Sequence, residues 1–245
     1  MDEVLENTKE GAKEAPKDKT VLTPELDGLF KAGSHLVYTR SRRHPSVKKL
    51  IFGKKNDLDI YDLNKTRALL DTALEYVENL SKENKTILFV GGKAEAREAL
   101  ESVSNELEMP YVSSRWIGGL LTNFDIVKKR IARLNDLREQ KSKGEFDRFN
   151  KKEQTVMQKE LETLEKNFSG VVGMEKLPHA LFVVDSRQEA IAVAEAKKMK
   201  IPVLSISGSD CDITKVDYAI AANDTSFKSI DFILKEVAKA YKRGK

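Results

Sequence analysis

Cysteine is nearly absent from this chain of 245 residues, and long apolar runs do not occur in it. The single cysteine, Cys211, cannot form an internal disulfide, which excludes a disulfide-stapled scaffold. No segment reaches the roughly 18 to 20 consecutive apolar residues that a bilayer-spanning helix needs. Residues 1–20 have neither a basic start nor an apolar run, which is not typical of a secretory signal. These absences predict a soluble, intracellular protein in a reducing compartment.

Catalytic signatures are equally scarce. The three histidines, His35, His44 and His179, give no metal-ligand spacing and no order typical of a catalytic triad. The only candidate phosphate-binding loop, ILFVGGKAEA, lacks the G-x-G-x-x-G spacing and has Ala94 where a Walker loop needs Ser or Thr. A tight strand-to-helix turn is the preferred interpretation of this loop. No constellation of residues favours catalysis, and no cofactor is expected.

Charge is present in quantity and is unevenly distributed. The net charge is only +4, from 43 Lys and Arg against 39 Asp and Glu, yet residues 31–55 carry eight basic side chains and no acidic one. Residues 1–20 mix both signs without apolar periodicity and are predicted to be a disordered tail. An unbroken basic stretch either repels itself in water or meets an anion. A polyanionic partner is therefore predicted, with a merely solvated basic face as the alternative.

Strand-like and helix-like segments alternate along most of the chain. Apolar runs such as KTILFVGG and ALFVVDS have the length of buried strands, and each is followed by helical spacing of apolar residues. Further strands are expected in MPYV, IPVLSISG and DYAIAAN. Strands that alternate with helices are typical of parallel βαβ units. The sequence therefore predicts an α/β fold with a parallel, flavodoxin-like sheet and helices on both faces.

The segment before the first of these strands has local signals of its own. Thr23 as an N-cap, Pro24 at the first helical position and Gly33 as a stop predict a short helix, and the basic stretch that follows it is expected to be a loop. The run KKLIFGKKNDLDIYDL has two short apolar stretches around a turn, which predicts a hairpin or a strand leading into the sheet. Asp62 is placed to cap the helix that follows.

A helical, charged segment interrupts the alternation between Val112 and Ala180. Two stretches with narrow apolar stripes flank the polar connector KSKGEFDRF, which predicts an inserted antiparallel coiled-coil hairpin of two helices. Thr122 and Asp125 approximate a capping box at the start of the first helix. The predicted organisation is a tail at 1–20, an α/β body that carries the predicted polyanion-binding stretch at 21–121 and 172–245, and an inserted hairpin at 122–171.

Two basic surfaces are candidates for binding phosphates. The first is the run TRSRRHPSVKK at 39–49, and the second combines Arg115 and Trp116, before a Gly-Gly bend, with the basic start of the first hairpin helix. A lone Trp is more often a core anchor than a stacking platform. Lys and Arg neutralise phosphates, which positions a protein on RNA. The expected RNA-binding residues are Arg40, Arg42, Arg43, His44, Lys48, Lys49, Arg115, Trp116, Asn123, Lys128, Lys129, Arg130 and Arg133.

Carboxylates collect after the later predicted strands, at Asp185, Asp210, Asp212 and Asp224. Strand ends are where open α/β sheets bind ligands, so these residues could hold a magnesium ion. Asp at such places more often caps a helix or complements its dipole, and this is the favoured interpretation. Whether a metal sits among these four residues stays open.

A series of short stretches resembles the bacterial small-subunit ribosomal protein two family. In order they are AGSH, an Arg-rich loop with Pro45, IFG, IYDLNKT, LFVGGK, YVSSRWIGGLLTNF, LPHALFVVDS, IPVLSI and the region from CD to VDYAIAAND. The stretch R-W-[IL]-G-G-x-L-T-N is the most specific, and the resemblance runs from about Thr23 to Tyr241. It implies a parallel α/β domain with an inserted helical coiled-coil hairpin, and no enzymatic activity.

The resemblance also implies partners and a place in the cell. The family is a structural component of the small ribosomal subunit, contacts small-subunit ribosomal RNA and neighbouring ribosomal proteins, and helps to dock ribosomal protein one. A cytoplasmic, ribosome-bound protein without a small-molecule substrate or membrane contact is therefore expected. The family commonly reads A-G-x-H-F-G-H-Q-T-R-R-W-N-P, whereas Val37 and Tyr38 stand here for the Gly-His pair and Arg43 for the Trp. A contact through that second histidine cannot be carried over.

Two other functions stay open on the residues alone. An α/β enzyme could bind a phosphorylated ligand at the acidic strand ends, and a regulatory RNA-binding protein could act outside the ribosome. Sedimentation of a cell lysate separates these alternatives, because only a ribosomal protein moves with the small-subunit fraction.

Overall fold

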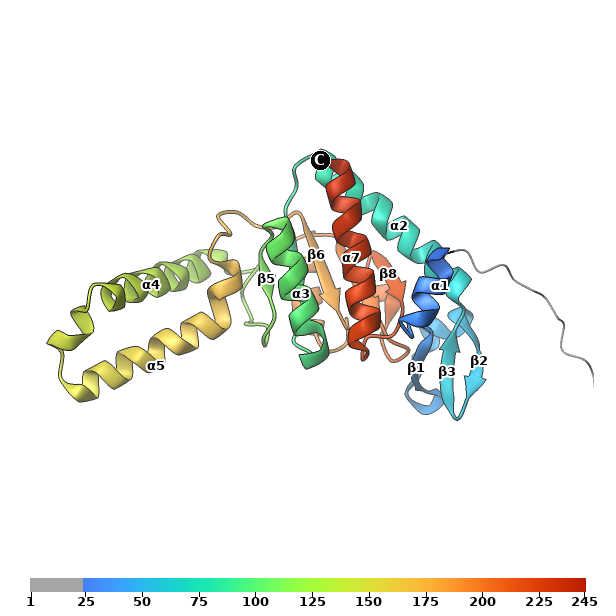
Figure 1. Ribbon diagram of the computed structural model, residues 1–245, viewed down its shortest axis with the longest axis horizontal. Coiled ribbons are helices and arrows are strands. Elements are labelled where there is room, and N and C mark those ends of the chain that lie inside the picture. The colour runs from blue at the N-terminus through green and yellow to red at the C-terminus, as the bar shows by residue number, and fades with distance from the viewer. Residues whose placement is uncertain (1–23) are drawn as a thin grey trace, which may run out of the picture.

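The computed structural model describes residues 24–245, and its centre is a five-stranded sheet (Figure 1). All strand pairs in this sheet are parallel, and the order is β5-β4-β6-β7-β8. The strands are β4 (Ile87–Val90), β5 (Tyr111–Val112), β6 (Ala180–Val184), β7 (Val203–Ser207) and β8 (Tyr218–Ala221). An order in which the first strand along the chain is second in the sheet is that of flavodoxin-like folds, which confirms the predicted fold class. The predicted tail and the Thr23 cap lie outside the described residues.

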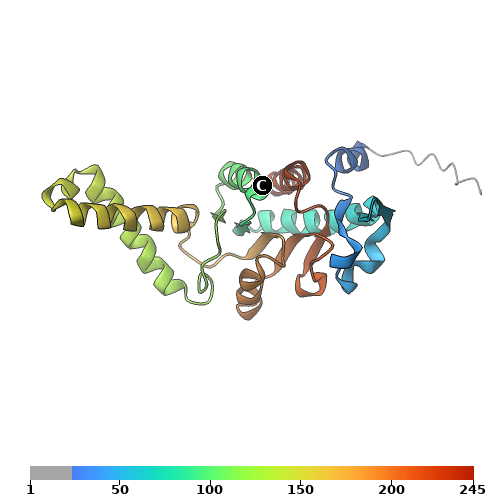
Figure 2. The same ribbon diagram turned by 90° about the horizontal axis from the view of Figure 1, so that it is seen from below.

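Helices cover both faces of this sheet (Figure 2). Besides the two helices of the projecting arm, they are α2 (Leu63–Lys82), α3 (Ala94–Leu107), α6 (Ala190–Lys198) and α7 (Phe227–Gly244), while α1 (Pro24–Lys31) packs against α2 and α7. Neighbouring strand residues point to opposite faces, so Phe89 packs in one core with α2, α3 and α7, while Leu88 packs in a second core with α6. No helix within residues 24–245 is long and apolar enough to cross a bilayer.

A second, smaller sheet lies at the β8 side of the body, where Val37 and Tyr61 pack with Ala221 of β8 (Figure 1). Its antiparallel strands are β1 (Leu36–Thr39), β2 (Ile51–Lys55) and β3 (Leu58–Tyr61), in the order β1-β3-β2. The hairpin of β2 and β3 is as predicted, and Asp62 caps α2 by accepting a hydrogen bond from the Asn64 N–H at 3.0 Å. The basic stretch was expected to be a loop. It instead contains the end of β1 and two 3-10 turns, Arg40–Arg42 and Pro45–Leu50.

Two long helices occupy the segment between β5 and β6 and project from the β5 end of the body (Figure 1). They are α4 (Phe124–Ser142) and α5 (Lys151–Phe168). Leu134 and Leu161 lie in their shared buried stripe, and Arg133 bridges the helices by donating to both carboxylate oxygens of Glu160 at 3.1 and 3.0 Å. The apolar core between α4 and α5 continues into the α6 face of the sheet. Whether residues 122–171 form a separate domain therefore stays a prediction.

The predicted capping box at the start of α4 was wrong. The N-cap is Asn123 and makes no side-chain cap bond, while the Thr122 hydroxyl donates to the carboxylate of Glu195 at 3.1 Å. A buried carboxylate from another element thus takes the hydroxyl that local spacing assigned to the cap. A capping box does occur at α5, where Asn150 and Glu153 bond reciprocally.

Candidate nucleic-acid interface

The first basic surface, residues 40–49, is fixed to the body. Val47 is fully buried in a small core with Tyr61 and Ala221. The His44 N–H donates to the Ser209 carbonyl at 2.8 Å, beyond the end of β7. The segment is therefore attached through its backbone and one apolar side chain, which leaves the basic side chains at the surface.

These basic side chains fall into two groups. Arg42 lies over the ring of Tyr38, 4.3 Å from its centroid, and 3.6 Å from the Asp210 carboxylate. Arg43 lies 3.4 Å from the Asp59 carboxylate, and only 17% of its side chain is exposed. Their charge is thus partly balanced within the protein. Three others are exposed and form no ion pair within residues 24–245: Arg40, Lys48 and Lys49.

His44 differs from its basic neighbours. Its Nδ1 lies 2.8 Å from the Ser46 hydroxyl and accepts a hydrogen bond from the Ser46 N–H at 3.3 Å, so it starts the second 3-10 turn. The Asp212 carboxylate is 3.9 Å from the same nitrogen. The structure gives this imidazole a local role in the turn.

The second basic surface lies where α4 leaves the body. Lys128 extends over the Phe124 ring, 4.9 Å from its centroid, and Arg133 is held by Glu160 as described above. Trp116 is 5% exposed and its indole N–H donates to Glu195 at 3.2 Å, so its ring has no face open to RNA. The exposed residues of this surface are Arg115, Asn123, Lys128, Lys129 and Arg130.

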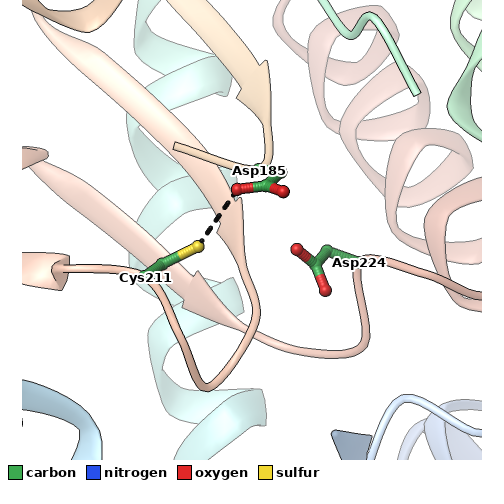
Figure 3. Close-up of side chains that lie close together, drawn as sticks. All are labelled: Asp185, Cys211 and Asp224. Atoms are coloured by element: carbon green, nitrogen blue, oxygen red, sulfur yellow. Dashed lines mark hydrogen bonds between the residues drawn. The ribbon is translucent and has the colours of Figure 1, made fainter. Parts of the chain in front are cut away.

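The strand-end carboxylates surround a lysine that the sequence analysis missed. The Lys93 ammonium, in the turn after β4, lies 2.7 Å from Asp185 and 2.8 Å from Asp224. Figure 3 shows these two carboxylates and Cys211 pointing toward one another, with the thiol donating to Asp185 at 3.3 Å. Ligand atoms of Asp185, Cys211 and Asp224 lie within 4.8 Å of one another. A cation could bind there only by displacing the ammonium of Lys93, which already neutralises part of the charge.

The carboxyl groups of Asp185 and Asp224, which share the Lys93 ammonium, have pKa values shifted in opposite directions. Burial raises the pKa of Asp224 to about 6, and the nearby charges of Asp185 and Asp210 act in the same direction. Burial also opposes ionisation of Asp185, but hydrogen bonds from Lys93 and the Gln188 N–H outweigh it and hold its pKa below the ordinary value. Burial raises the pKa of the Cys211 thiol to about 12, which makes it a poor nucleophile.

The capping interpretation holds for Asp212, which caps a 3-10 turn through the Thr214 N–H at 3.1 Å. Asp185 accepts hydrogen bonds from the Arg187 and Gln188 N–H groups at 2.9 and 3.0 Å, but these belong to the turn before α6, whose N-cap is Glu189. The interpretation is wrong for the other two. Asp210 accepts from the Arg187 guanidinium at 2.8 Å, and Asp224 pairs with Lys93.

Comparison with known proteins assigns the chain to a family. The family model described as ribosomal protein S2 matches residues 29–244. The chain belongs to the ribosomal protein S2 family. It is 40% identical over 220 residues to the small ribosomal subunit protein uS2 of Coprothermobacter proteolyticus, and the match covers 90% of this chain and 82% of that protein. The S2 family is structural and non-enzymatic, which decides against the enzyme alternative for the strand-end carboxylates.

The exposed aromatic side chain of Phe52 was also missed by the sequence analysis. Ile51 pairs with Tyr61 and Gly53 with Ile60, so Phe52 is the extra residue of a β-bulge in β2. Bulges redirect side chains, and Phe52 is 79% exposed. The motif IFG gave no sign of this, because a Phe between apolar neighbours is ordinarily part of the core.

Proposed function

We propose that this chain is a structural constituent of the small ribosomal subunit that binds its ribosomal RNA, bound to the ribosome in the cytoplasm. The observation that carries the proposal is the attachment of residues 40–49, which fixes the backbone that bears Arg40, Lys48 and Lys49, while their exposed side chains form no ion pairs among residues 24–245. Because the backbone is already ordered, only these side chains have to be ordered when they meet phosphates. Arg42 and Arg43 contribute less, because carboxylates already lie beside them.

The two basic surfaces lie at opposite ends of the body. The small sheet with residues 40–49 is beside β8, and α4 leaves beyond β5 at the other end of the sheet (Figure 1). Arg115, Lys128, Lys129 and Arg130 form the exposed cations of the second surface. A rigid sheet between two basic surfaces holds two RNA segments at a set spacing. This arrangement suits a structural role in assembly of the subunit, because such a role requires binding of RNA at both ends of the body and no catalytic turnover.

Neighbouring ribosomal proteins, including ribosomal protein one, are the second class of partner. Phe52 supports this part of the proposal, because a large aromatic side chain that is 79% exposed is typical of a contact with another protein. Leu36 and Leu58 add exposed apolar surface on the same small sheet. Crosslinking from position 52 in assembled subunits would identify the protein that covers this surface.

The proposal is tested by sedimentation of a cell lysate. The wild-type chain is expected in the small-subunit fraction, and Arg40→Ala, Lys48→Ala and Lys49→Ala combined should move a substantial share to the top of the gradient. The matched control is Lys198→Ala, Lys200→Ala and Lys228→Ala, which removes three exposed cations elsewhere and should co-sediment as wild type. A wild-type chain found only in the free pool would favour a regulatory RNA-binding protein instead.

A further inference from the structure

The loop 113–123 between β5 and α4 is organised around a single carboxylate, that of Glu195 on α6. Its two oxygens accept five hydrogen bonds from the loop. The donors are the Trp116 indole at 3.2 Å, the backbone N–H groups of Gly119 at 2.7 Å, Leu121 at 3.1 Å and Thr122 at 3.1 Å, and the Thr122 hydroxyl at 3.1 Å. Five donors exceed what most carboxylates receive in a protein, and all come from one loop.

This carboxylate has no cationic partner within residues 24–245, although Glu195 is only 9% exposed. Its charge is stabilised by N–H and O–H dipoles alone. Burial raises its pKa, but the hydrogen bonds from Gly119, Thr122 and Trp116 outweigh that effect and lower the pKa below its ordinary value. The ionised form is thus the one that the loop binds, and it lies near the N-terminus of α4, where the helix dipole favours an anion.

The loop joins the body to the projecting helices. On the body side, Glu195 belongs to α6, whose Ala192 and Ala196 pack against the sheet. Toward the arm, the Ser114 hydroxyl donates to the Lys166 carbonyl at the end of α5 at 3.0 Å. Gly119 has a φ of +92°, a conformation that L side chains rarely adopt, and its N–H reaches the carboxylate from there.

Apolar contacts alone do not set the direction of this loop. Trp116, Leu120 and Leu121 are buried, and their burial supplies most of the attraction between loop and body. Hydrophobic burial is non-directional, whereas hydrogen bonds to an ionised acceptor are strong and depend on angle. Five such bonds fix both the position and the orientation of the peptide groups that lead into α4.

We propose that Glu195 is a positioning residue that fixes the angle at which α4 and α5 leave the body. In doing so it sets the spacing between the basic start of α4 and residues 40–49. The part of this inference that concerns RNA rests on the proposed function; the part that concerns the angle does not.

The angle is measured by the distance between two spin labels, one at Lys151→Cys near the tip of the arm and one at Lys228→Cys on α7. Both positions are exposed, and the buried Cys211 does not compete for the label. The wild-type background should give one narrow distance distribution. Glu195→Gln replaces one acceptor oxygen by an N–H donor that faces other donors, so the distribution should broaden or shift.

Glu189→Gln is the matched control. Glu189 is also a buried carboxylate at α6, but within residues 24–245 it accepts a single hydrogen bond, from the Gly92 N–H at 3.1 Å, and none from the loop. It should keep the wild-type distribution. A wild-type distribution in Glu195→Gln, or equal broadening in both variants, overturns the proposal. If Glu195→Gln shows no cooperative unfolding, Thr122→Val decides in its place, since it removes one donor and should broaden the distribution less.

The RNA part makes a quantitative prediction. Apparent affinity falls in proportion to the fraction of molecules in the binding-competent arrangement. If about half of the Glu195→Gln molecules keep the wild-type distance, their affinity for a small-subunit ribosomal RNA fragment should fall about twofold, with an unchanged salt dependence because no cation is lost. Unchanged affinity despite a broadened distribution overturns this part. Absence of binding by the wild type contradicts the proposed function, and the label distances still decide the role of Glu195.

Discussion

Replacing Lys93 by Met is the most informative perturbation of the body. The substitution keeps the length of the side chain and removes the ammonium that lies 2.7 Å from Asp185 and 2.8 Å from Asp224. Asp224 is 1% exposed, and about a tenth of the Lys93 side chain is exposed. Removing one partner of a buried ion pair leaves an uncompensated charge and costs about 3 to 5 kcal/mol. With an m-value of about 3 kcal/mol per M for a chain of this size, the urea midpoint should fall by roughly 1 to 1.7 M.

The loss should depend on pH with a definite sign. Without the ammonium, both carboxylates have raised pKa values in the folded state, because burial and their mutual repulsion oppose ionisation. A carboxyl whose folded pKa exceeds its unfolded value binds more protons when folded, so its stabilising contribution is present at low pH and is lost as pH rises through the folded pKa. In the wild type this applies to Asp224, whose pKa is about 6. The variant should therefore recover part of its stability between pH 8 and pH 5.

Urea unfolding followed by circular dichroism at pH 8 and pH 5 measures both effects. Lys235→Met is the control, because Lys235 forms an exposed ion pair with Asp231 on one helix and should leave the midpoint unchanged. A Lys93→Met midpoint within error of wild type at pH 8 would refute the reasoning. So would a loss of the same size at both pH values, since it would show that the carboxylates do not titrate differently without the lysine.

Two further changes test local features of the fold. Asp62→Ala removes the side-chain cap on Asn64 at the start of α2 and should lower the free energy of unfolding by about 1 kcal/mol in urea, whereas no loss would show that the cap contributes nothing. Gly119→Ala places a side chain at a φ of +92° and should cost roughly 1 to 3 kcal/mol; Gly118→Ala, where a Cβ has space, is its control, and equal losses would remove the argument from backbone strain.

The parallel sheet could be predicted because its strands are continuous apolar runs. ILFV and ALFVV are buried on both faces, so their apolar character is unbroken, and the helices between them keep an apolar period. The α4 and α5 stripes were visible for the same reason. β1 was missed because LVYT is a short strand in a small antiparallel sheet. It lies directly before the basic run, and that part of the chain was interpreted from its charge and not as a strand. Local sequence patterns are weak predictors of short strands of this kind.

The candidate site could be predicted in part. The exposed cations of residues 40–49 follow from composition, because a polar segment lies at the surface. The ion-pair partners of these cations cannot be predicted from composition, because Arg43 meets Asp59 and Arg42 meets Asp210 only once the chain has folded. Lys93 and Asp224 are far apart in sequence, and no periodicity links them. Pairings of this kind depend on the sheet order, which brings the ends of β4, β6 and β8 to one edge.

The central claim is that residues 40–49 bind ribosomal RNA phosphates, and a salt titration tests it most directly. Binding of the wild type and of the variant with Arg40→Ala, Lys48→Ala and Lys49→Ala to a small-subunit ribosomal RNA fragment is measured across salt concentrations, after circular dichroism confirms that both are folded. Each lost phosphate contact should make the slope of log K against log salt shallower by roughly 0.7 to 0.9, or about 2 to 3 units for all three. Affinity should fall as well. An unchanged affinity and slope in the folded variant would contradict the account.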